Sequence, residues 1–536
     1  MRKFLTIVTG TLISGSVLAG GLVTNTNQSA SWVRLPARNA STEVDAAYFN
    51  PAGLMKLENG FHVSLSNQTI FQTRKIESTY PYLNSGSYTG KVTAPFFPSI
   101  YAVYKLDKLA FSIGFVPIGG GGGAEYKTGL PSFEMSPSDL VPALAASQGA
   151  TAYRLNVYFK GSSTFLGYQG AVSYKINDCI SLAAGARYVT AKNTYSGYLK
   201  DIEVNIASGW TRADLIMTGI AASAGAGGAN LQPIITAGAG SFTADQLVGA
   251  GQMTLAQRNA IVNGLTSLGV SNPASLTISQ SQTAFYGAQA KYTGTATLLA
   301  DQSADVTQTG SGVSPFFSVN ISPSENLDIA IKYEMATKLE LTNKTTKDLL
   351  IGYTATGTPI TEFPDGEKVR NDMPALLTIG VDYKLSKLKI SIGGDYYFDK
   401  TADYGHMIDA DLNSSTPVTH IANKNIIANN GMSVEGGLEY NITDKFLVSG
   451  GYVYANKGVN SQYQSDLTYG LATHTFGAGG AYSINENIKI NLGASYTLYM
   501  DDSKTVHHFL GTLDMQPKET YSKSTILFGI GLDMKF

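Results

Sequence analysis

The chain ends on the stretch ILFGIGLDMKF, residues 526–536, and the alternation in this stretch decides the fold class. Large apolar side chains fall on every second position, at Ile526, Phe528, Ile530, Leu532, Met534 and Phe536. Glycine or charged residues stand between most of them. Period-two alternation predicts a β-strand with one apolar face and one polar face. Residues 488–498 and 388–399 alternate in the same way. A soluble β-sandwich would alternate too, so this pattern alone does not identify a membrane barrel.

The lengths of the connections separate these two folds. Short turns are expected at residues 107–108, 177–178, 323–326, 386–387, 443–445 and 485–487. Long segments alternate with them, at 73–96, 127–154, 208–304, 345–373, 402–429, 458–471 and 502–522. Transmembrane barrels combine short periplasmic turns with long external loops and an even strand number. The sequence therefore predicts an all-β fold, a transmembrane antiparallel β-barrel of about 14 strands over residues 60–536. The final Phe536 fits this fold, because the barrel-assembly machinery reads such a C-terminal strand.

The N-terminus has the features of a signal peptide over residues 1–19. A basic segment at residues 1–3 precedes an apolar run at 4–18, and Ala19 stands before the expected cleavage at Gly20. That run of about fifteen residues is short for a spanning helix of roughly twenty. An exported chain without a spanning helix can reside in a membrane as a closed barrel. The bacterial outer membrane is therefore the expected location.

Composition disfavours several other classes. The net charge is -2 without a block of like charges, so no nucleic-acid partner is expected. The single cysteine, Cys179, excludes an intramolecular disulfide framework. Neither a nucleophile motif nor a metal-ligand spacing accompanies the six histidines, which are His62, His406, His420, His474, His507 and His508. No enzyme activity, cofactor or metal is therefore expected, although an outer-membrane acyl enzyme stays an alternative.

Residues 20–59 precede the first strand and are expected to fold back into the barrel as a hatch. Asn50 is a good helix N-cap, Pro51 suits the first helical position, and Ala52 continues a short apolar helix. A free tail would have little use for its aromatic residues, such as Trp32 and Tyr48. The alternative is a periplasmic linker. A plugged lumen would also argue against a general porin, which keeps an open, water-filled channel.

The hatch sequence resembles a known family. Residues 45–54, DAAYFNPAGL, are similar to the N-terminal signature of the FadL-type outer-membrane transporters of long-chain fatty acids. Residues 94–101 resemble their second strand, 111–123 their kinked third strand, and 170–188 their fourth hairpin. The resemblance implies a barrel of fourteen strands with an N-terminal luminal hatch. A monomer is expected separately, because a closed barrel of fourteen strands has no unpaired edge. It also implies passive uptake of a hydrophobic small molecule, which leaves sideways into outer-membrane lipid. Long-chain fatty acids are the first expectation, and aromatic or other hydrocarbons are the alternative.

The third expected strand is interrupted in a way that suggests a lateral exit. Alternation over residues 109–116 is followed by Pro117 and, after Ile118, by Gly119, Gly120, Gly121, Gly122 and Gly123. Proline donates no ladder hydrogen bond, and glycine permits backbone angles closed to other residues. Because a barrel has no edge, a break is expected to separate this strand from a neighbour. The alternative is that the strand ends at Pro117 and a loop begins.

The longest loop, 208–304, is expected to form a helical, apolar cap outside the cell. Two capping-box patterns begin at Thr243 and Thr254. An apolar stripe at helical spacing follows the second, at Leu255, Ile261, Val262, Leu265 and Leu268. The functional interpretation is a surface that captures a hydrophobic substrate. The alternatives are packing against another loop and a contact between two copies.

Overall fold

The computed structural model describes residues 29–353, 358–404, 407–408, 419–420 and 427–536. The expected signal peptide, the first part of the expected hatch and His406 lie outside these residues. Fourteen antiparallel strands form a closed barrel, as the alternation and the loop lengths predict. The wall strands are β1 (Gly60–Ser78), β2 (Ser87–Leu106), β3 (Leu109–Tyr126), β4 (Ala152–Lys175), β5 (Ile180–Ile206), β7 (Gln302–Ser324), β8 (Leu327–Glu334), β13 (Leu376–Leu385), β14 (Leu388–Tyr397), β17 (Gly431–Asn441), β18 (Phe446–Asn456), β19 (Thr473–Asn485), β20 (Ile488–Tyr499) and β24 (Lys518–Lys535).

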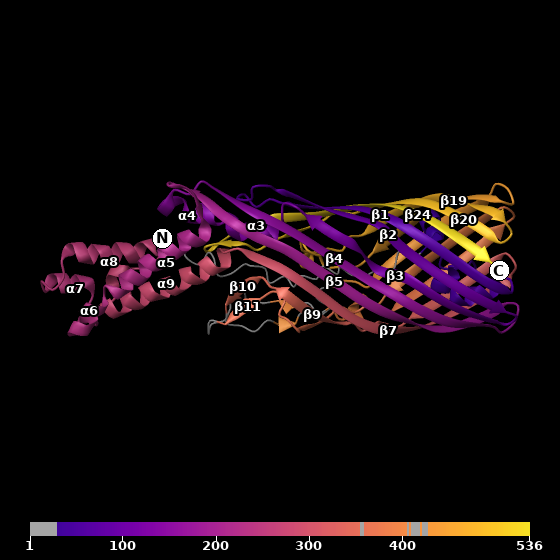
Figure 1. Ribbon diagram of the computed structural model, residues 1–536, viewed down its shortest axis with the longest axis horizontal. Coiled ribbons are helices and arrows are strands. Elements are labelled where there is room, and N and C mark those ends of the chain that lie inside the picture. Colours follow the sequence, from indigo (N-terminus) through magenta and orange to yellow (C-terminus); the bar gives the residue numbers. More distant parts are fainter. Residues whose placement is uncertain (1–28, 354–357, 405–406, 409–418, 421–426) are drawn as a thin grey trace.

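The C-terminal strand closes the barrel. β24 pairs with β20 on one side and with β1 on the other, from His62 opposite Lys535 to Ser78 opposite Glu519. The expected short turns join neighbouring strands at one end, and the chain terminates at that end (Figure 1). The long loops gather at the opposite end.

The outer surface of the wall is apolar over the part nearest the short turns. Large side chains are exposed there on successive strands, including Phe61, Phe111, Val172, Phe317, Ile392, Leu438, Phe476, Leu492 and Phe528. Exposed side chains of this kind are stable against lipid and unfavourable against water. The outward set of residues 526–530 is the apolar face that the sequence predicts.

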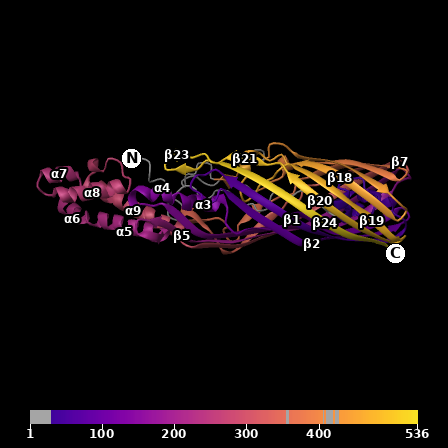
Figure 2. The ribbon, with the colours of Figure 1, turned by 90° about the horizontal axis from the view of Figure 1, so that it is seen from above.

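Several strands are longer than predicted. β1 and β2 run up to Ser78 and from Ser87, inside the expected loop 73–96, and β24 starts at Lys518. β5 has 27 residues, whereas about nine to eleven suffice to cross a membrane. At about 3.3 Å per residue it is roughly 90 Å long. β4, β5 and β7 therefore continue far beyond the apolar belt as a stalk (Figures 1 and 2).

Shorter strands lie at the long-loop end of the molecule. β6 (Gly209–Arg212) pairs with β5, and β21 (Asp502–Thr505) pairs with β24. β9 (Glu340–Lys347) follows β8 along β7 and pairs with β12 (Lys368–Arg370). The remaining small pairs are β10 (Leu350–Tyr353) with β11 (Pro359–Thr361), β15 (Met407–Ile408) with β16 (Thr419–His420), and β22 (Phe509–Leu510) with β23 (Leu513–Asp514).

The stalk carries a helical head made by residues 213–299 (Figure 2). Its elements are α5 (Ala213–Ala229), α6 (Gln232–Ile234), η2 (Ile235–Ala239), α7 (Ala244–Gly249), α8 (Leu255–Ser267), η3 (Pro273–Ser275) and α9 (Ile278–Leu299). Both predicted capping boxes are present, at Thr243 and Thr254, and Thr277 forms a third.

The other helices lie near the ends of the barrel. α3 (Pro131–Ser138) and α4 (Leu140–Gln148) follow β3, and η4 (Asp399–Thr401) and η5 (Ser461–Tyr463) lie in later loops. α1 (Ala30–Arg34), α2 (Ala46–Phe49) and η1 (Pro51–Lys56) precede the first strand. Among the described residues, no helix has the length and apolar character needed to span a bilayer.

Candidate functional site: a plugged lumen beside a broken ladder

Residues 29–59 lie inside the barrel at the short-turn end. α1 contacts β19, β20 and β24, whereas η1 contacts β4, β5 and β7, so the segment touches opposite parts of the wall. Residues 29–41 and 44–55 are buried. We refer to residues 29–59 as the hatch.

The wall makes room for the hatch with glycine. Nine glycines have hatch atoms where a Cβ would stand, namely Gly380, Gly393, Gly437, Gly451, Gly477, Gly479, Gly493, Gly529 and Gly531. A Cβ on Gly493 would lie 2.7 Å from the backbone nitrogen of Arg34. A Cβ on Gly477 would lie 2.5 Å from the carbonyl oxygen of Val33. Such contacts are too short for carbon, so glycine here permits close approach of the hatch backbone. We call these nine residues the glycine seat.

Asn50 does not act as the predicted N-cap. It precedes η1, but its side chain accepts no hydrogen bond from that helix. Its Nδ2 donates to Oδ1 of Asn320 (2.8 Å) and to the carbonyl oxygen of Ser41 (3.2 Å), while its Oδ1 accepts from Ser318 (3.0 Å). Because Asn50 is completely buried, its amide needs partners on both ends, and β7 supplies two of them. Pro51 begins η1, which is a 3-10 helix, and Ala52 is buried within it.

The wall also caps the hatch backbone with polar side chains. Donors on β4, β5 and β8 reach four hatch carbonyl oxygens: Gln169 to Ala47 (2.6 Å), Ser173 to Pro51 (2.7 Å), Ser181 to Ala52 (2.8 Å) and Lys332 to Tyr48 (2.8 Å). These bonds satisfy carbonyls that would otherwise be buried without a partner.

Charged groups hold the other side of the hatch. Arg34 pairs with Glu439 on β17 and donates through Nε to Asn491 on β20 (3.1 Å). Glu43 accepts from Lys489 on β20 (2.5 Å). Arg34 is fully buried, so removal of Glu439 would leave it with only Glu43, at 3.9 Å, as a counter-charge, at a cost of up to about 3–5 kcal/mol.

β3 continues through the predicted interruption. It runs through Pro117 and all five glycines to Tyr126, so the alternative in which the strand ends at Pro117 is wrong. Its pairing with β4 extends from Leu109 to Tyr126, with register shifts at Pro117/Gly119 and Gly120/Gly122. Toward β2 the ladder is interrupted between Phe115, which is opposite Ile100, and Glu125, which is opposite Lys91. Residues 92–99 and 116–124 thus form no ladder pair with one another. We call these two segments the ladder break.

Prolines occur on both sides of the ladder break. Pro117 lies on β3, and β2 contributes Pro95 and Pro98. None of the three has an N–H to donate across the break. Phe96, between the two β2 prolines, is 77% exposed on the outside of the wall. The two β2 prolines were not predicted as part of the exit, although two prolines within one expected strand are a visible signal.

Gly120 is the most constrained of the five glycines. Its φ is 80°, and a Cβ there would lie 2.0 Å from the carbonyl oxygen of Ser163 on β4. Only glycine adopts this backbone angle at so close an approach. The structure therefore places the predicted gate residues in a distorted strand that stays attached to β4 and separates from β2.

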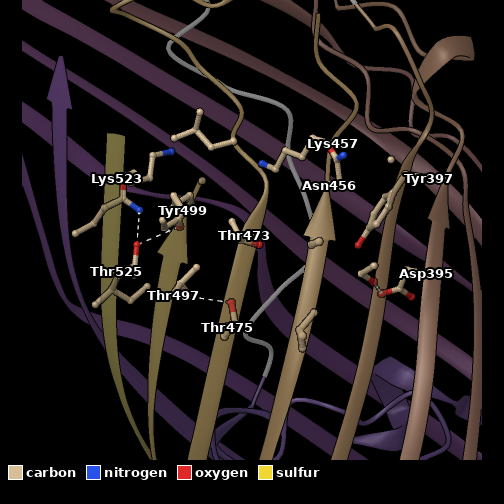
Figure 3. Close-up of a pocket in the computed structure, with 18 of the residues that line it drawn as sticks. Asp395, Tyr397, Asn456, Lys457, Thr473, Thr475, Thr497, Tyr499, Lys523 and Thr525 are labelled. Carbon is tan, nitrogen blue, oxygen red and sulfur yellow. Dashed lines mark hydrogen bonds between the residues drawn. The ribbon is translucent and has the colours of Figure 1, made fainter. Parts of the chain in front are cut away.

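A cavity of about 270 Å³ lies in the lumen and reaches from the hatch to the ladder break. The hatch contributes Trp32, Tyr48 and Phe49, and the wall near the break contributes Gly120 and Ala124. Further apolar lining comes from Ile70, Val92, Phe159, Leu467, Leu471 and Leu527. Threonines of β19, β20 and β24 and Tyr499 of β20 line another side, where Thr475 and Thr497 are hydrogen-bonded (Figure 3).

The loop-side end of this cavity carries three cations, and Asp399 lies near one of them, Lys457. Arg74, Lys457 and Lys523 all line it, and Figure 3 shows both lysines on the same side as Tyr499 and Asn456. Lys457 follows the end of β18 and lies outside the membrane-spanning segment. Burial lowers its pKa to about 8, Asp399 opposes this shift, and Arg74 adds to it.

A second, smaller pocket of about 50 Å³ lies on the stalk. Its lining is largely apolar, with Phe133, Tyr158, Leu199, Leu350, Ile351 and Phe363 among the contributors. Phe159 and Leu467 line both this stalk pocket and the lumen cavity, so these two side chains separate the two spaces.

The apolar stripe of α8 is largely used for packing within the head. Ile261, Leu265 and Leu268 are buried in a cluster with Ile278 and Phe285 of α9. Val262 is half-buried, and Leu255 is 62% exposed. For the three buried residues the structure therefore corrects the capture interpretation, because a side chain in a helical core offers no surface to a ligand.

Four of the histidines act as local partners. His508 lies 2.9 Å from Asp139 and is buried, His507 contacts Asp514, His474 contacts Tyr452, and His62 contacts the carbonyl of Glu58. Within the described ranges, no three or more histidine, cysteine or acidic side chains are placed to share a metal ion.

These features define a class of protein: a closed barrel of fourteen strands, filled at one end by its own N-terminal segment, with the FadL-type transporter fold. The crystal structure of a Pseudomonas aeruginosa FadL homologue matches 96% of this chain and 100% of its own at 14% identity, with a TM-score of 0.57.

Two further solved structures are similar at lower scores. The Ralstonia pickettii toluene transporter TbuX covers 92% of this chain and 94% of its own, at 14% identity and a TM-score of 0.47. The P. putida toluene transporter TodX covers 94% and 98%, at 13% identity and the same TM-score. No protein-family model matches the sequence, and no curated protein matches it.

Proposed function

We propose that this protein carries a hydrophobic small molecule across the bacterial outer membrane without energy input. A long-chain fatty acid is the expected substrate, and an aromatic or other hydrocarbon is the alternative. The observation that carries the proposal is the contact between the lumen cavity and the ladder break, through Gly120 and Ala124. A hatch that fills the lumen toward the short turns disfavours passage straight through, and a break in the wall favours passage sideways.

The proposed route has three steps. The substrate first occupies the apolar stalk pocket, then passes Phe159 and Leu467 into the lumen cavity, and finally leaves through the ladder break into lipid. Each buried CH₂ group of a substrate chain contributes about 0.8 kcal/mol, so apolar linings of this kind suffice for capture. The named lateral-gate residues in this route are Pro117 and the glycines 119–123. We further propose a monomer, inserted by the barrel-assembly machinery.

The ladder break can be tested by restoring its missing donors. The triple variant Pro95→Thr, Pro98→Thr and Pro117→Thr supplies three N–H groups and a good strand former at each position. The matched control is Pro315→Thr, because Pro315 lies opposite Ala186 in an unbroken part of the β5–β7 ladder. Uptake of labelled hexadecanoate is measured in cells that lack their own transporter.

The triple variant is expected to lower uptake at least fivefold, toward the level of cells without the protein, while the control transports normally. Amide hydrogen exchange on β2 and β3 reports whether the ladder has closed. Full uptake by a variant whose β2 and β3 amides have become protected would contradict lateral exit. Equal uptake by cells with and without the wild-type protein would contradict the transport function itself.

A further inference from the structure

β2 changes its faces at the ladder break. Even-numbered side chains are buried before the break and odd-numbered ones after it, as Val92 and Tyr101 illustrate. An extra residue within one strand produces this change of face. It occurs where one residue of β1, Thr69, lies opposite two residues of β2, Pro95 and Phe96, because the register between these strands shifts there. The ladder break therefore contains a β-bulge, on the strand that separates from β3.

Two side chains of β1 bind residues 95–97, which we call the β2 bulge. The Nδ2 of Asn67 and the hydroxyl of Thr69 both donate to the carbonyl oxygen of Pro95, each at 3.1 Å. The Oδ1 of Asn67 accepts from the backbone N–H of Phe97 at 3.0 Å. A bulge leaves backbone groups outside the regular ladder. The two side chains of β1 therefore replace main-chain bonds that the β2 bulge cannot make.

Asn67 and Thr69 lie on the lipid-facing side of the wall. Their partners on β24, Ile530 and Phe528, are exposed on the outer surface. Gln68, between them, is buried on the inner face. The nearby outward positions of β1 include large apolar side chains, at Phe61, Leu65 and Phe71. A polar side chain in this belt carries a desolvation cost unless it has a hydrogen-bond partner, and the β2 bulge supplies that partner.

These hydrogen bonds explain how a broken ladder is stable in lipid. An unpaired backbone N–H or carbonyl group is unfavourable inside the hydrocarbon of a bilayer. The carbonyl of Pro95 and the N–H of Phe97 lie within the interruption of the β2–β3 ladder, yet they are satisfied from β1. Groups that are bound to β1 do not need β3. Without Asn67 and Thr69, pairing with β3 would be the nearest source of partners, and the ladder break would close.

We propose that Asn67 and Thr69 are positioning residues for lateral exit, because they hold the β2 bulge on the β1 side and so keep the ladder break open. This inference rests on the proposed transport function and identifies residues that act on its last step. Both side chains face lipid, whereas the lumen cavity lies on the inner face of the wall. Loss of their hydrogen bonds should therefore slow the exit of the substrate and leave its binding in the cavity unchanged.

The test variant is Asn67→Leu with Thr69→Val. These changes keep the side-chain volumes close to the originals and remove the hydrogen bonds to the β2 bulge. The matched control is Thr73→Val, which is on the same face of β1 and opposite Lys91, where the register between β1 and β2 is regular. Uptake of labelled hexadecanoate is measured in cells that lack their own transporter.

Binding is measured separately from uptake, on the purified full chain in lipid nanodiscs. The chain has 2 tryptophans, and Trp32 of the hatch lines the lumen cavity. The Trp210→Phe background leaves Trp32 as the fluorescent reporter, and the probe is hexadecanoate. Resistance of the barrel to heating in detergent reports that each variant is folded.

The double variant is expected to lower uptake about fivefold or more, the factor that corresponds to the loss of about one net hydrogen bond. Its affinity for hexadecanoate should stay within about twofold of wild type, because the cavity lining is unchanged. Amide hydrogen exchange at residues 116–124 should slow as β2 pairs with β3. Thr69→Ser keeps the hydroxyl and should transport normally, as should the Thr73→Val control. A merely structural role would instead lower affinity and heat resistance together with uptake.

Each other outcome overturns a defined statement. Wild-type uptake by the folded double variant would overturn the positioning role and leave the transport proposal intact. Parallel loss of uptake and affinity, or an equal loss of uptake in the Thr73→Val control, would overturn the role as well. If the double variant does not fold, Thr69→Val alone decides, because uptake equal to that of Thr69→Ser would overturn the role. Equal uptake by cells with and without the wild-type protein would contradict the transport proposal itself.

Discussion

The glycine seat gives a direct way to displace the hatch without touching it. We consider the double variant Gly477→Val and Gly493→Val, on β19 and β20. The atoms nearest to a new Cβ at these positions belong to the hatch, at 2.5 Å and 2.7 Å, and they are backbone atoms that cannot rotate away. The wall itself should tolerate the change, because valine favours a strand more than glycine does.

The size of the effect follows from overpacking. A side chain forced into a filled space costs about 1–3 kcal/mol, so two such sites cost about 2–6 kcal/mol if they act independently. A value near 4 kcal/mol would lower the ratio of docked to undocked hatch by roughly a thousandfold, since each 1.4 kcal/mol is a factor of ten. The hatch should therefore loosen or leave the lumen while the barrel stays folded.

Planar-bilayer conductance is the assay. The wild-type protein is expected to be electrically nearly silent, and the double variant should show ion-conducting openings. The matched control is Gly436→Val on β17, where the nearest atom to a new Cβ is 3.8 Å away and no hatch atom is close. A double variant that folds and stays as silent as the control would refute the reasoning, because the hatch would then not depend on the glycine seat.

Four other perturbations test separate parts of the account. Asn50→Ala should loosen the hatch by about 1–3 kcal/mol for each partner left unsatisfied, more than loss of a helix cap, and should increase protease cleavage of the hatch. Hexadecanoate should bind more weakly as the pH rises from 7 to 9, because Lys457, which lines the lumen cavity, loses its proton near pH 8, and Lys457→Arg should flatten that profile. Phe363→Ser in the stalk pocket should slow uptake with the barrel intact, and a variant with unchanged uptake would remove that pocket from the route. Leu265→Ser should cost about 2–5 kcal/mol in the helical head, seen as lost helical circular dichroism, with uptake unchanged; retained helicity would argue against the packing interpretation.

The barrel was predictable from the sequence because the alternation that marks its strands is visible in neighbouring residues. Alternation over residues 526–536 sets which side chains face lipid, and the turn and loop lengths set the strand order. The ends of the strands were not predictable in this way. β1, β2 and β24 continue into segments whose outward side chains are polar, such as Glu77, Lys91 and Lys518, so the apolar face that marks a lipid-facing strand is lost there.

The site was predictable only in part. Pro117 and the glycines after it mark an interruption by composition alone, and the structure places a ladder break beside them. The role of Asn50 was not accessible, because its partners on β7 are about 270 residues away in the chain. The residues next to Asn50 in the sequence would be the same whether it capped η1 or joined the hatch to β7. The glycine seat was not predicted for a similar reason: Gly529 lies on the polar side of an alternating strand, and only the hatch atoms near it explain why it is glycine.

Arg74 on β1 and Lys523 on β24, which lie directly opposite each other, illustrate a further limit. Arg74 and Lys523 are separated by most of the chain, and only closure of the barrel through β1 and β24 brings them opposite each other. Sequence position gives no hint of a pair made by ring closure. The register between β1 and β24 identifies the pair directly, because one aligned pair of residues fixes which side chains are neighbours on the inner face.

The central claim is that the substrate leaves the lumen sideways at the ladder break. Photo-crosslinking with a diazirine-labelled hexadecanoate in intact cells, followed by mass spectrometry of the labelled peptides, tests it most directly. The account predicts that the labelled peptides include residues 92–99 and 116–124, together with the lumen cavity, and that these adducts depend on the three prolines. Adducts on the short-turn face of the hatch around Lys56, with none at the ladder break, would contradict lateral exit and point to passage through the plugged end.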